Sequence, residues 1–168
     1  MEKPQHTALV NELCDALSKL PVSKSGKRVL LSGIMADDEA MLKVIEDYGM
    51  SVACDDLAQE TRQFRYDVPD DGDNAMYRLA KWWQIFVGCS LAYDPSKKRI
   101  DMIMEDIKKY NVSGVVICMM KFCDPEEYDY PLMKAVLEEK GIPSLYMEID
   151  QQAEAQAQTR IQAFSEIL

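Results

Sequence analysis

The fold is decided by residues 114–129, which read Gly-Val-Val-Ile-Cys-Met-Met-Lys-Phe-Cys-Asp-Pro-Glu-Glu-Tyr-Asp. The apolar run from Val115 to Met119 is short, unbroken and bounded by turn residues on both sides. Such a run is typical of a strand that is buried on both faces of a parallel sheet. Cys123 follows at the carboxyl end of this strand, where open α/β sheets bind their ligands. A small residue that merely fills a strand-to-helix turn explains Cys123 equally well at this point.

Further strands and helices are predicted on either side of this strand. Strands are expected at 28–32, 50–54 and 143–149, and helices at 7–20, about 38–48, 74–87, 96–110, 126–140 and 153–168. Because Pro131 is favoured at a helix start, the helix at 126–140 is expected to begin properly near it. The pattern indicates an α/β fold: a four-stranded parallel sheet of flavodoxin-like order 2-1-3-4, with helices on both faces.

Two segments are expected along the chain. Residues 1–26 are interpreted as a helix and linker from a missing upstream half, and residues 27–168 as a C-terminal α/β domain. The first helix has no predicted element beside it to pack on, and four strands are few for a free-standing sheet of this kind. Both features favour a companion domain.

The composition excludes several classes of function. A net charge of -10 over 168 residues disfavours nucleic acid and anionic membranes as partners. No stretch approaches a membrane span or the apolar core of a signal peptide, so a cytoplasmic location is expected. Five cysteines without a C-x-x-C pair do not suggest a disulfide framework or a zinc ribbon. Any metal site must therefore draw its ligands from distant parts of the chain or from another chain.

Charged and aromatic motifs leave two interpretations open. The pair Asp55-Asp56, followed by Arg62 and Arg65, is either functional or a capped short helix with solvated charges. The Lys-Lys-Arg run at 97–99 is typical of a solvated helix face. Of the adjacent tryptophans at 82–83, one is expected in the core and the other at a partner or ligand surface, because both cannot face one side of a helix.

Four separated blocks of sequence, in one order, resemble the 2-hydroxyacyl-CoA dehydratase and benzoyl-CoA reductase subunit family. They are ACDDLAQETRQFR at 53–65, GCSLAYDP at 88–95, GVVICMMKFCDPEEYDYP at 114–131 and GIPSLYMEID at 141–150. The similarity runs from about residue 28 to the C-terminus, and is strongest to the C-terminal half of the (R)-2-hydroxyglutaryl-CoA dehydratase β subunits (component D). Family subunits are roughly twice as long as this chain.

The resemblance implies an incomplete iron–sulfur site. In the family, three cysteines of each subunit hold a [4Fe-4S] cluster; Cys89 and Cys123 match two of them, and the third lies in the N-terminal half. This chain alone is therefore expected to be inactive and not to hold the cluster stably. Gly88 and Phe122 are expected to shape the surroundings of the cluster. The residues Glu60, Arg62 and Glu126 lie near the site, each more readily structural than catalytic, and no catalytic residue is assigned.

The resemblance also implies a reaction and partners. The family removes water from an (R)-2-hydroxyacyl-CoA by radical syn-elimination, after an ATP-hydrolysing iron–sulfur activator has supplied one electron. Iron would act as a Lewis acid and the cluster as an electron store. Expected partners are the N-terminal half, a homologous α subunit, the activator and an acyl-CoA, with 2-hydroxyglutaryl-CoA as substrate in anaerobic amino-acid fermentation.

A stand-alone flavodoxin-like binding or assembly module without catalytic activity is the alternative to a dehydratase part. The two readings differ in the surface that they predict. A fragment should expose an apolar face near the first helix or the tryptophans at 82–83. A genuine short protein should cover that face.

Overall fold

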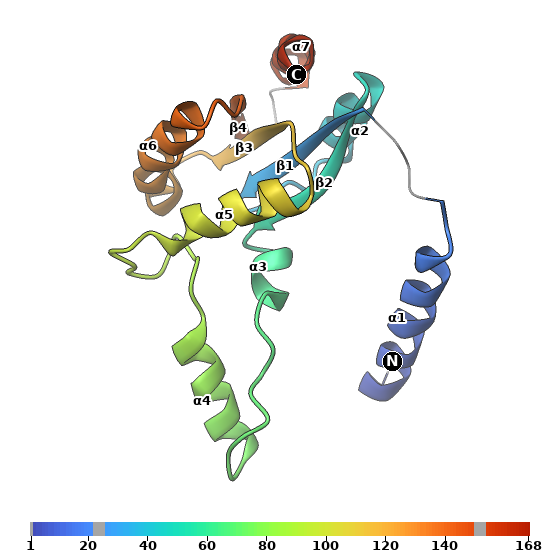
Figure 1. Ribbon diagram of the computed structural model, residues 1–168, viewed down its shortest axis with the longest axis vertical. Coiled ribbons are helices and arrows are strands. Elements are labelled where there is room, and N and C mark those ends of the chain that lie inside the picture. Colours follow the sequence, from blue (N-terminus) through green and yellow to red (C-terminus); the bar gives the residue numbers. More distant parts are fainter. Residues whose placement is uncertain (1, 22–25, 150–153) are drawn as a thin grey trace.

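The four strands run parallel in one sheet of order β2-β1-β3-β4 (Figure 1). The computed structural model describes residues 2–21, 26–149 and 154–168. The strands are β1 (Lys27–Gly33), β2 (Met50–Leu57), β3 (Gly114–Met120) and β4 (Ser144–Ile149). The predicted strand order is therefore confirmed. Strand β3 contains the apolar run from Val115 to Met119, which predicted a strand at this place.

In the part of the chain that the structure describes, seven helices connect and flank the strands. They are α1 (Lys3–Ser18), α2 (Glu39–Asp47), α3 (Thr61–Phe64), α4 (Ala75–Ile85), α5 (Lys98–Lys109), α6 (Asp124–Glu139) and α7 (Glu154–Ile167). Each predicted helix is present to within a few residues. Ala153 of the predicted last helix and residues 22–25 of the predicted linker lie outside the described residues.

Two apolar layers sandwich the sheet, one on each face. Along β1 the side chains alternate, so that Val29 and Leu31 enter one layer and Leu30 enters the other. The first layer is completed by α2 and α7, and the second by α5 and α6, through buried residues that include Met41, Ile45, Ile161, Phe164, Ile103, Ile107, Met133 and Leu137. Burying each large side chain contributes about 1.5–3 kcal/mol, so these layers hold the sheet together. Helices on both faces are thus confirmed.

The start of α6 differs from the prediction. The helix begins at Asp124 rather than near Pro131, which lies inside it. Pro125 occupies the first turn, where a missing N–H costs nothing, and the first turn carries Asp124, Glu126 and Glu127. Carboxylates stabilise the positive end of a helix, so the helix already begins at this turn, ahead of the internal proline.

Strand β2 is also longer than predicted. It continues to Leu57, where the prediction ended at residue 54, because β1 extends beside it and pairs Leu31 with Asp55 and Ser32 with Asp56. An irregularity in the pairing after Val29 shifts the register by one residue. Strand pairing therefore carries Asp56 into the interior, at the carboxyl end of the sheet.

Two helices extend away from the sheet (Figure 1). They are α1 and α4, the latter carried on an arm formed by residues 66–88. Neither helix has a buried residue, and both expose large apolar side chains, namely Leu9, Val10, Leu13 and Leu17 of α1 and Met76, Leu79, Trp83 and Ile85 of α4. These helices lack the apolar cover that the other long helices find on the sheet.

The tryptophan prediction is half wrong. Trp83 is 66% exposed, as expected for a partner surface, but Trp82 is only half-buried and belongs to neither core layer. Its indole Nε1 donates to the carbonyl of Tyr66 at 2.7 Å, and its ring packs against Phe86. Trp82 therefore ties the two limbs of the arm together, because the arm is too far from the sheet for either ring to reach the core.

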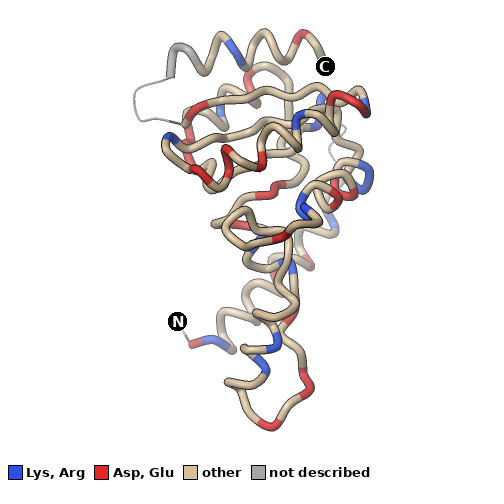
Figure 2. The backbone as a smooth tube through the Cα atoms, turned by 90° about the vertical axis from the view of Figure 1, so that its left-hand side faces the viewer, with Lys and Arg blue, Asp and Glu red and all other residues tan. Residues whose placement is uncertain are grey.

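Charge is spread over the whole molecule. Figure 2 shows basic and acidic positions interspersed over the sheet and along the arm. Within the described ranges, every helix is too short or too polar to cross a membrane.

Candidate functional site

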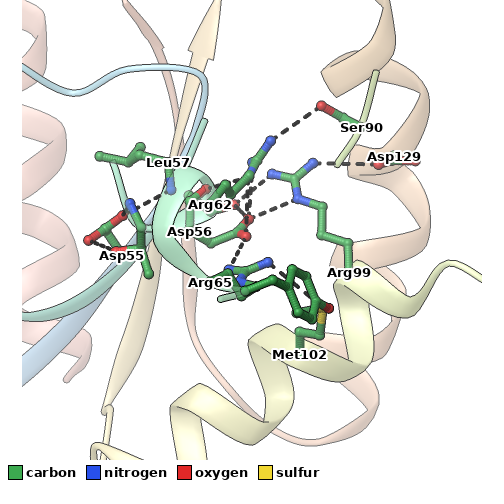
Figure 3. A network of polar contacts seen from close by, with 12 residues as sticks. Asp55, Asp56, Leu57, Arg62, Arg65, Ser90, Arg99, Met102 and Asp129 are labelled. Carbon is green, nitrogen blue, oxygen red and sulfur yellow. Dashed lines mark hydrogen bonds and ion pairs between the residues drawn. The ribbon is translucent and has the colours of Figure 1, made fainter. Parts of the chain in front are cut away.

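A buried polar network lies at the carboxyl end of the sheet, where the sequence predicted a ligand site (Figure 3). Its centre is Asp56, whose side chain is fully buried at the end of β2. The carboxylate accepts from Nη2 of Arg62 at 3.0 Å, from Nη2 of Arg65 at 2.9 Å and from Nε of Arg99 at 2.8 Å. Ser32 at the end of β1 donates to it at 3.0 Å. One carboxylate thus joins β1, β2, the α3 segment and α5.

A second buried carboxylate extends the network to α6. Glu126 lies opposite Arg62 Nη1 at 3.0 Å and Arg99 Nη2 at 2.8 Å, and it is 1% exposed. It also accepts from the hydroxyl of Ser90 at 2.5 Å. Asp129, one turn further along α6, pairs with Nζ of Lys97 at 2.7 Å. The loop that contains Ser90 and Lys97 is therefore tied to the first two turns of α6.

The charges of the network keep Asp56 and Glu126 ionised. Burial would raise the pKa of Asp56, but Arg99, Arg62 and Arg65 outweigh it and hold that pKa below its ordinary value. The pKa of Glu126 is likewise lowered, because Arg99 and Arg62 outweigh its burial. Burial would lower the pKa of Arg99, but its carboxylate partners Asp56 and Glu126 raise that pKa above the ordinary value. Paired ionised groups of this kind fix geometry, because leaving either partner alone is costly.

The network corrects two expectations about charge. Arg62 and Arg99 are 2% and 3% exposed, so neither belongs to a solvated face. The capped short helix is confirmed, because Asp55 accepts from the backbone N–H groups of Leu57 and Thr61 at 3.1 Å each. Burying a charge is costly unless it is paired, and here Asp56 and Glu126 supply that pairing.

The five residues that were expected near or around the site now have positions. Glu126 and Arg62 are members of the network, whereas Glu60 is exposed and makes no capping hydrogen bond with its side chain. Gly88 is buried, and Phe122 is 92% exposed with its backbone in the left-handed region. Ser32, Ser90 and Asp129 are network residues that the sequence did not single out.

Two cysteines lie beside this network. Cys89 is in the loop between α4 and α5, directly before Ser90, and Cys123 is the N-cap residue of α6, three residues before Glu126. Both are half-buried, so both remain open to a ligand. The hydrogen bond between Ser90 and Glu126 thereby links the residue after Cys89 to the first turn of α6, which follows Cys123.

The remaining cysteines are poor thiolate donors or lie elsewhere. Burial, followed by the nearby Asp106 and Asp55, raises the pKa of Cys54 to about 12. Burial in β3 raises the pKa of Cys118 to about 12. Both thiols are therefore protonated at neutral pH, and the thiolate is the form that binds metals. Cys14 is exposed on α1.

Gly88 allows the Cys89 loop to approach the network closely. Its backbone is in the left-handed region, at φ +81°, where glycine is favoured. A Cβ placed there would lie 2.6 Å from Sδ of Met102 and 3.0 Å from Nη1 of Arg65. The missing side chain thus lets this loop lie against Met102 and Arg65.

A cavity of about 370 Å³ opens beside the network. It is lined by the loop from Ser90 to Pro95, by Lys97 and by the start of α6. The Lys97–Asp129 ion pair contributes polar groups to this lining, and the exposed rings of Tyr93 and Tyr128 contribute aromatic surface. Such a hollow suits a small ligand held by a few polar groups and aromatic contacts.

The donor set at this edge is suitable for iron but incomplete. Iron–sulfur clusters are held by cysteine thiolates that need not be close in sequence, and a four-iron cluster takes four ligands. Cys89 and Cys123 are accessible and lie on two loops that meet through Ser90 and Glu126. Among the described residues, no group of three or more His, Cys, Asp or Glu side chains is placed to hold a metal ion. A cluster held by Cys89 and Cys123 would need further ligands from outside these residues.

Comparison with known proteins gives a family model and three relatives. A family model described as "2-hydroxyglutaryl-CoA dehydratase, D-component" matches residues 1–168. The lactoyl-CoA dehydratase subunit beta of Anaerotignum propionicum is 43% identical over 171 residues, which cover 100% of this chain and 46% of the relative. The (R)-phenyllactyl-CoA dehydratase beta subunit of Clostridium sporogenes is 44% identical over 171 residues, which cover 100% of this chain and 45% of the relative.

A third relative extends the same pattern. The (R)-2-hydroxyglutaryl-CoA dehydratase subunit beta of Acidaminococcus fermentans is 35% identical over 174 residues, with 46% of the relative covered. The chain thus spans about half the length of the curated relatives that it matches.

Proposed function

The chain belongs to the 2-hydroxyglutaryl-CoA dehydratase D-component family, and from this membership we propose that it forms the C-terminal part of a dehydratase β subunit. The reaction proposed is removal of water from an (R)-2-hydroxyacyl-CoA after one-electron activation. The named substrates of the three relatives differ in their acyl chains. The substrate proposed is therefore the thioester class, with 2-hydroxyglutaryl-CoA as one member rather than a unique choice.

One observation carries this proposal: two half-buried cysteines flank a hydrogen bond between Ser90 and Glu126 at the carboxyl edge of the sheet. Cys89 and Cys123 would supply two thiolate ligands to a [4Fe-4S] cluster, and the upstream part of the subunit would complete the site. When bound, the cluster would store and release one electron. The chain's own contribution is to hold the two thiolates at a fixed, open edge by means of the buried network behind them.

The exposed apolar helices support a covering partner. α1 and α4 expose Leu13 and Trp83 at 57% and 66%, as the fragment reading predicted near the first helix and the tryptophans. Clustered apolar surface of this kind marks interaction sites. We assign this surface to the upstream half of the same subunit. A homologous α subunit and an ATP-hydrolysing iron–sulfur activator are the further partners proposed.

The test restores the missing half and then removes the ligands one at a time. This chain is produced anaerobically together with the N-terminal half of the lactoyl-CoA dehydratase β subunit, and iron, sulfide and visible absorbance are measured. The unmutated pair is expected to hold one cluster per subunit. Cys89→Ala and Cys123→Ala should each lose most of it, because a missing thiolate opens the cluster to solvent.

The matched control is Cys54→Ala, which removes a thiol whose raised pKa keeps it protonated. It should retain the iron and sulfide of the unmutated pair. Equal iron in the Cys89→Ala, Cys123→Ala and Cys54→Ala variants would contradict the assignment. A full cluster on this chain alone would contradict the expectation that the site is shared.

A further inference from the structure

The hydroxyl of Ser90 joins two parts of the molecule that carry one cysteine each. It donates to Oε1 of Glu126 at 2.5 Å, and Nη1 of Arg62 lies 3.4 Å from the hydroxyl and 3.0 Å from the same carboxylate oxygen. We propose that this hydrogen bond positions Cys89 beside Cys123, so that Ser90 and Glu126 are positioning residues for the thiol pair. The inference rests on the proposed function, in which the two thiolates act together.

Glu126 is the fixed end of this contact. It is 1% exposed, lies in the first turn of α6, and is held by ion pairs of 3.0 Å to Arg62 and 2.8 Å to Arg99. Two guanidinium groups on opposite oxygens leave the carboxylate little freedom to rotate. Cys123 precedes the same turn as its N-cap residue, so its backbone is fixed by the same helix start.

The loop of Cys89 is the adjustable end. In the described part of the chain, the hydrogen bonds that tie residues 86–97 to α6 come from two side chains, Ser90 and Lys97. The backbone bonds of this loop stay local, from Ala92 to Cys89 and from Lys97 to Asp94. Lys97 is attached eight positions after Cys89, whereas Ser90 is its immediate neighbour. Ser90 therefore controls where Cys89 lies.

Removing the Ser90 hydroxyl leaves no buried charge without a partner. Glu126 keeps both arginines, so Ser90→Ala is expected to free the loop while the domain stays folded. Ser90→Thr retains a hydroxyl and should restore the contact. Ser96→Ala is the matched control, because Ser96 donates its hydroxyl to Asp94 within the same loop and makes no contact with α6 through it.

The test measures how often the two thiols meet. The chain with Cys14→Ser is treated anaerobically with dibromobimane, in which each thiolate displaces one bromide; two C–S bonds form, two bromide ions leave, and the doubly alkylated product fluoresces. Peptide mass spectrometry locates the bridge. Monobromobimane, which needs one thiol only, measures the reactivity of each cysteine by itself.

Bridging between Cys89 and Cys123 is expected to slow by about tenfold or more in Ser90→Ala, the smallest factor that one hydrogen bond to a charged group contributes. Single alkylation by monobromobimane should not change, which separates positioning from a general loss of structure. Ser90→Thr and Ser96→Ala should bridge at nearly the original rate. Bridging at the original rate in Ser90→Ala would overturn the inference.

Two further results are decisive. If near-UV circular dichroism shows Ser90→Ala to be unfolded, Glu126→Asp replaces it: the shorter carboxylate keeps the charge near both arginines but withdraws from Ser90, and the same slowing is expected. If the starting chain forms no bridge at all, the thiols are not neighbours, and the proposed cluster ligands fail along with the inference. A bridge that is unaffected by either variant rejects the positioning role alone.

Discussion

Asp56 is the residue on which most of the site geometry depends. Its carboxylate meets Arg62, Arg65 and Arg99 at 3.0, 2.9 and 2.8 Å, without exposure to solvent. A buried ion pair adds little net stability compared with apolar packing, but it is costly to break from one side. The network is therefore best regarded as a device that fixes positions, and its contribution is measured by removing one partner.

We predict that Asp56→Asn destabilises the chain by about 3–5 kcal/mol, because the variant leaves buried arginines without their shared counter-charge. The measurement is the urea unfolding midpoint at neutral pH. Asp47→Asn is the control, since it breaks an exposed pair with Lys43 and should change the midpoint little. Similar midpoints for the two variants would show that the arginines find other partners.

Sequence reasoning named Cys89 and Cys123 as candidate ligands but missed that the charged residues beside them are buried, for a physical reason. Charge alone does not tell whether a side chain is solvated, and Arg99 stands in a Lys-Lys-Arg run that reads as exposed. A signal was nevertheless present. Arg99 lies four positions before the buried Ile103, and Glu126 and Asp129 precede the buried Met133 on α6, so these charges share the apolar faces of their helices.

At the scale of elements, the ends of β1 and β3 set how closely the loops of the site approach. Gly33 ends β1 opposite Cys118 of β3, with φ +153°. A Cβ on Gly33 would lie 2.2 Å from the backbone carbonyl oxygen of Cys118. Backbone atoms in the centre of a sheet cannot move aside as a flexible side chain can, so this position admits glycine alone.

Gly33→Ala is accordingly expected to destabilise the chain by about 3 kcal/mol or more, from backbone strain together with the enforced shift of a central strand. Chemical denaturation followed by far-UV circular dichroism gives the value. Gly49→Ala provides the comparison, because Gly49 also has a positive φ but has open space around it, and it should lose only about 1 kcal/mol. Equal losses would mean that the sheet adjusts without penalty.

Element type was easier to predict than element boundaries. Apolar periodicity predicted all four strands and the six longer helices, because burial on a sheet requires that periodicity. The boundaries that failed were those fixed by long-range contacts. β2 runs on because β1 extends beside it, and the first turn of α6 is stabilised not only by its proline and acidic residues but also by the pairing of Glu126 with the buried arginines. Neither partner is visible in the local sequence.

At the scale of the whole molecule, the network links acid stability to the fold. Asp56 and Glu126 have pKa values lowered from 3.8 and 4.5 in the folded chain. Their stabilising effect is fully present above those ordinary values and is lost as pH falls towards the lower folded ones, because the unfolded chain then binds more protons. Stability should therefore rise with pH across the acidic range and level off near neutrality.

The expected result is a urea midpoint that is nearly constant from about pH 7 to 5.5 and falls progressively below about pH 5. Repeating the series at high salt separates buried from surface pairs, since screening weakens exposed pairs far more than buried ones. The acid-induced fall should persist in salt. A midpoint that rises on acidification would contradict the prediction, because lowered carboxyl pKa values require stability to fall as the pH falls.

The same network also bears on the order in which the chain reaches its native state. Its contacts join residues 43, 64 and 67 positions apart, and parallel strands need long crossovers before they can pair. Closing such loops is slow compared with forming helices, so the edge that carries Cys89 and Cys123 is completed late in folding. In the proposed cluster site, the thiols of a newly made chain would still lie apart, which would favour delivery of metal after the sheet has closed rather than during synthesis.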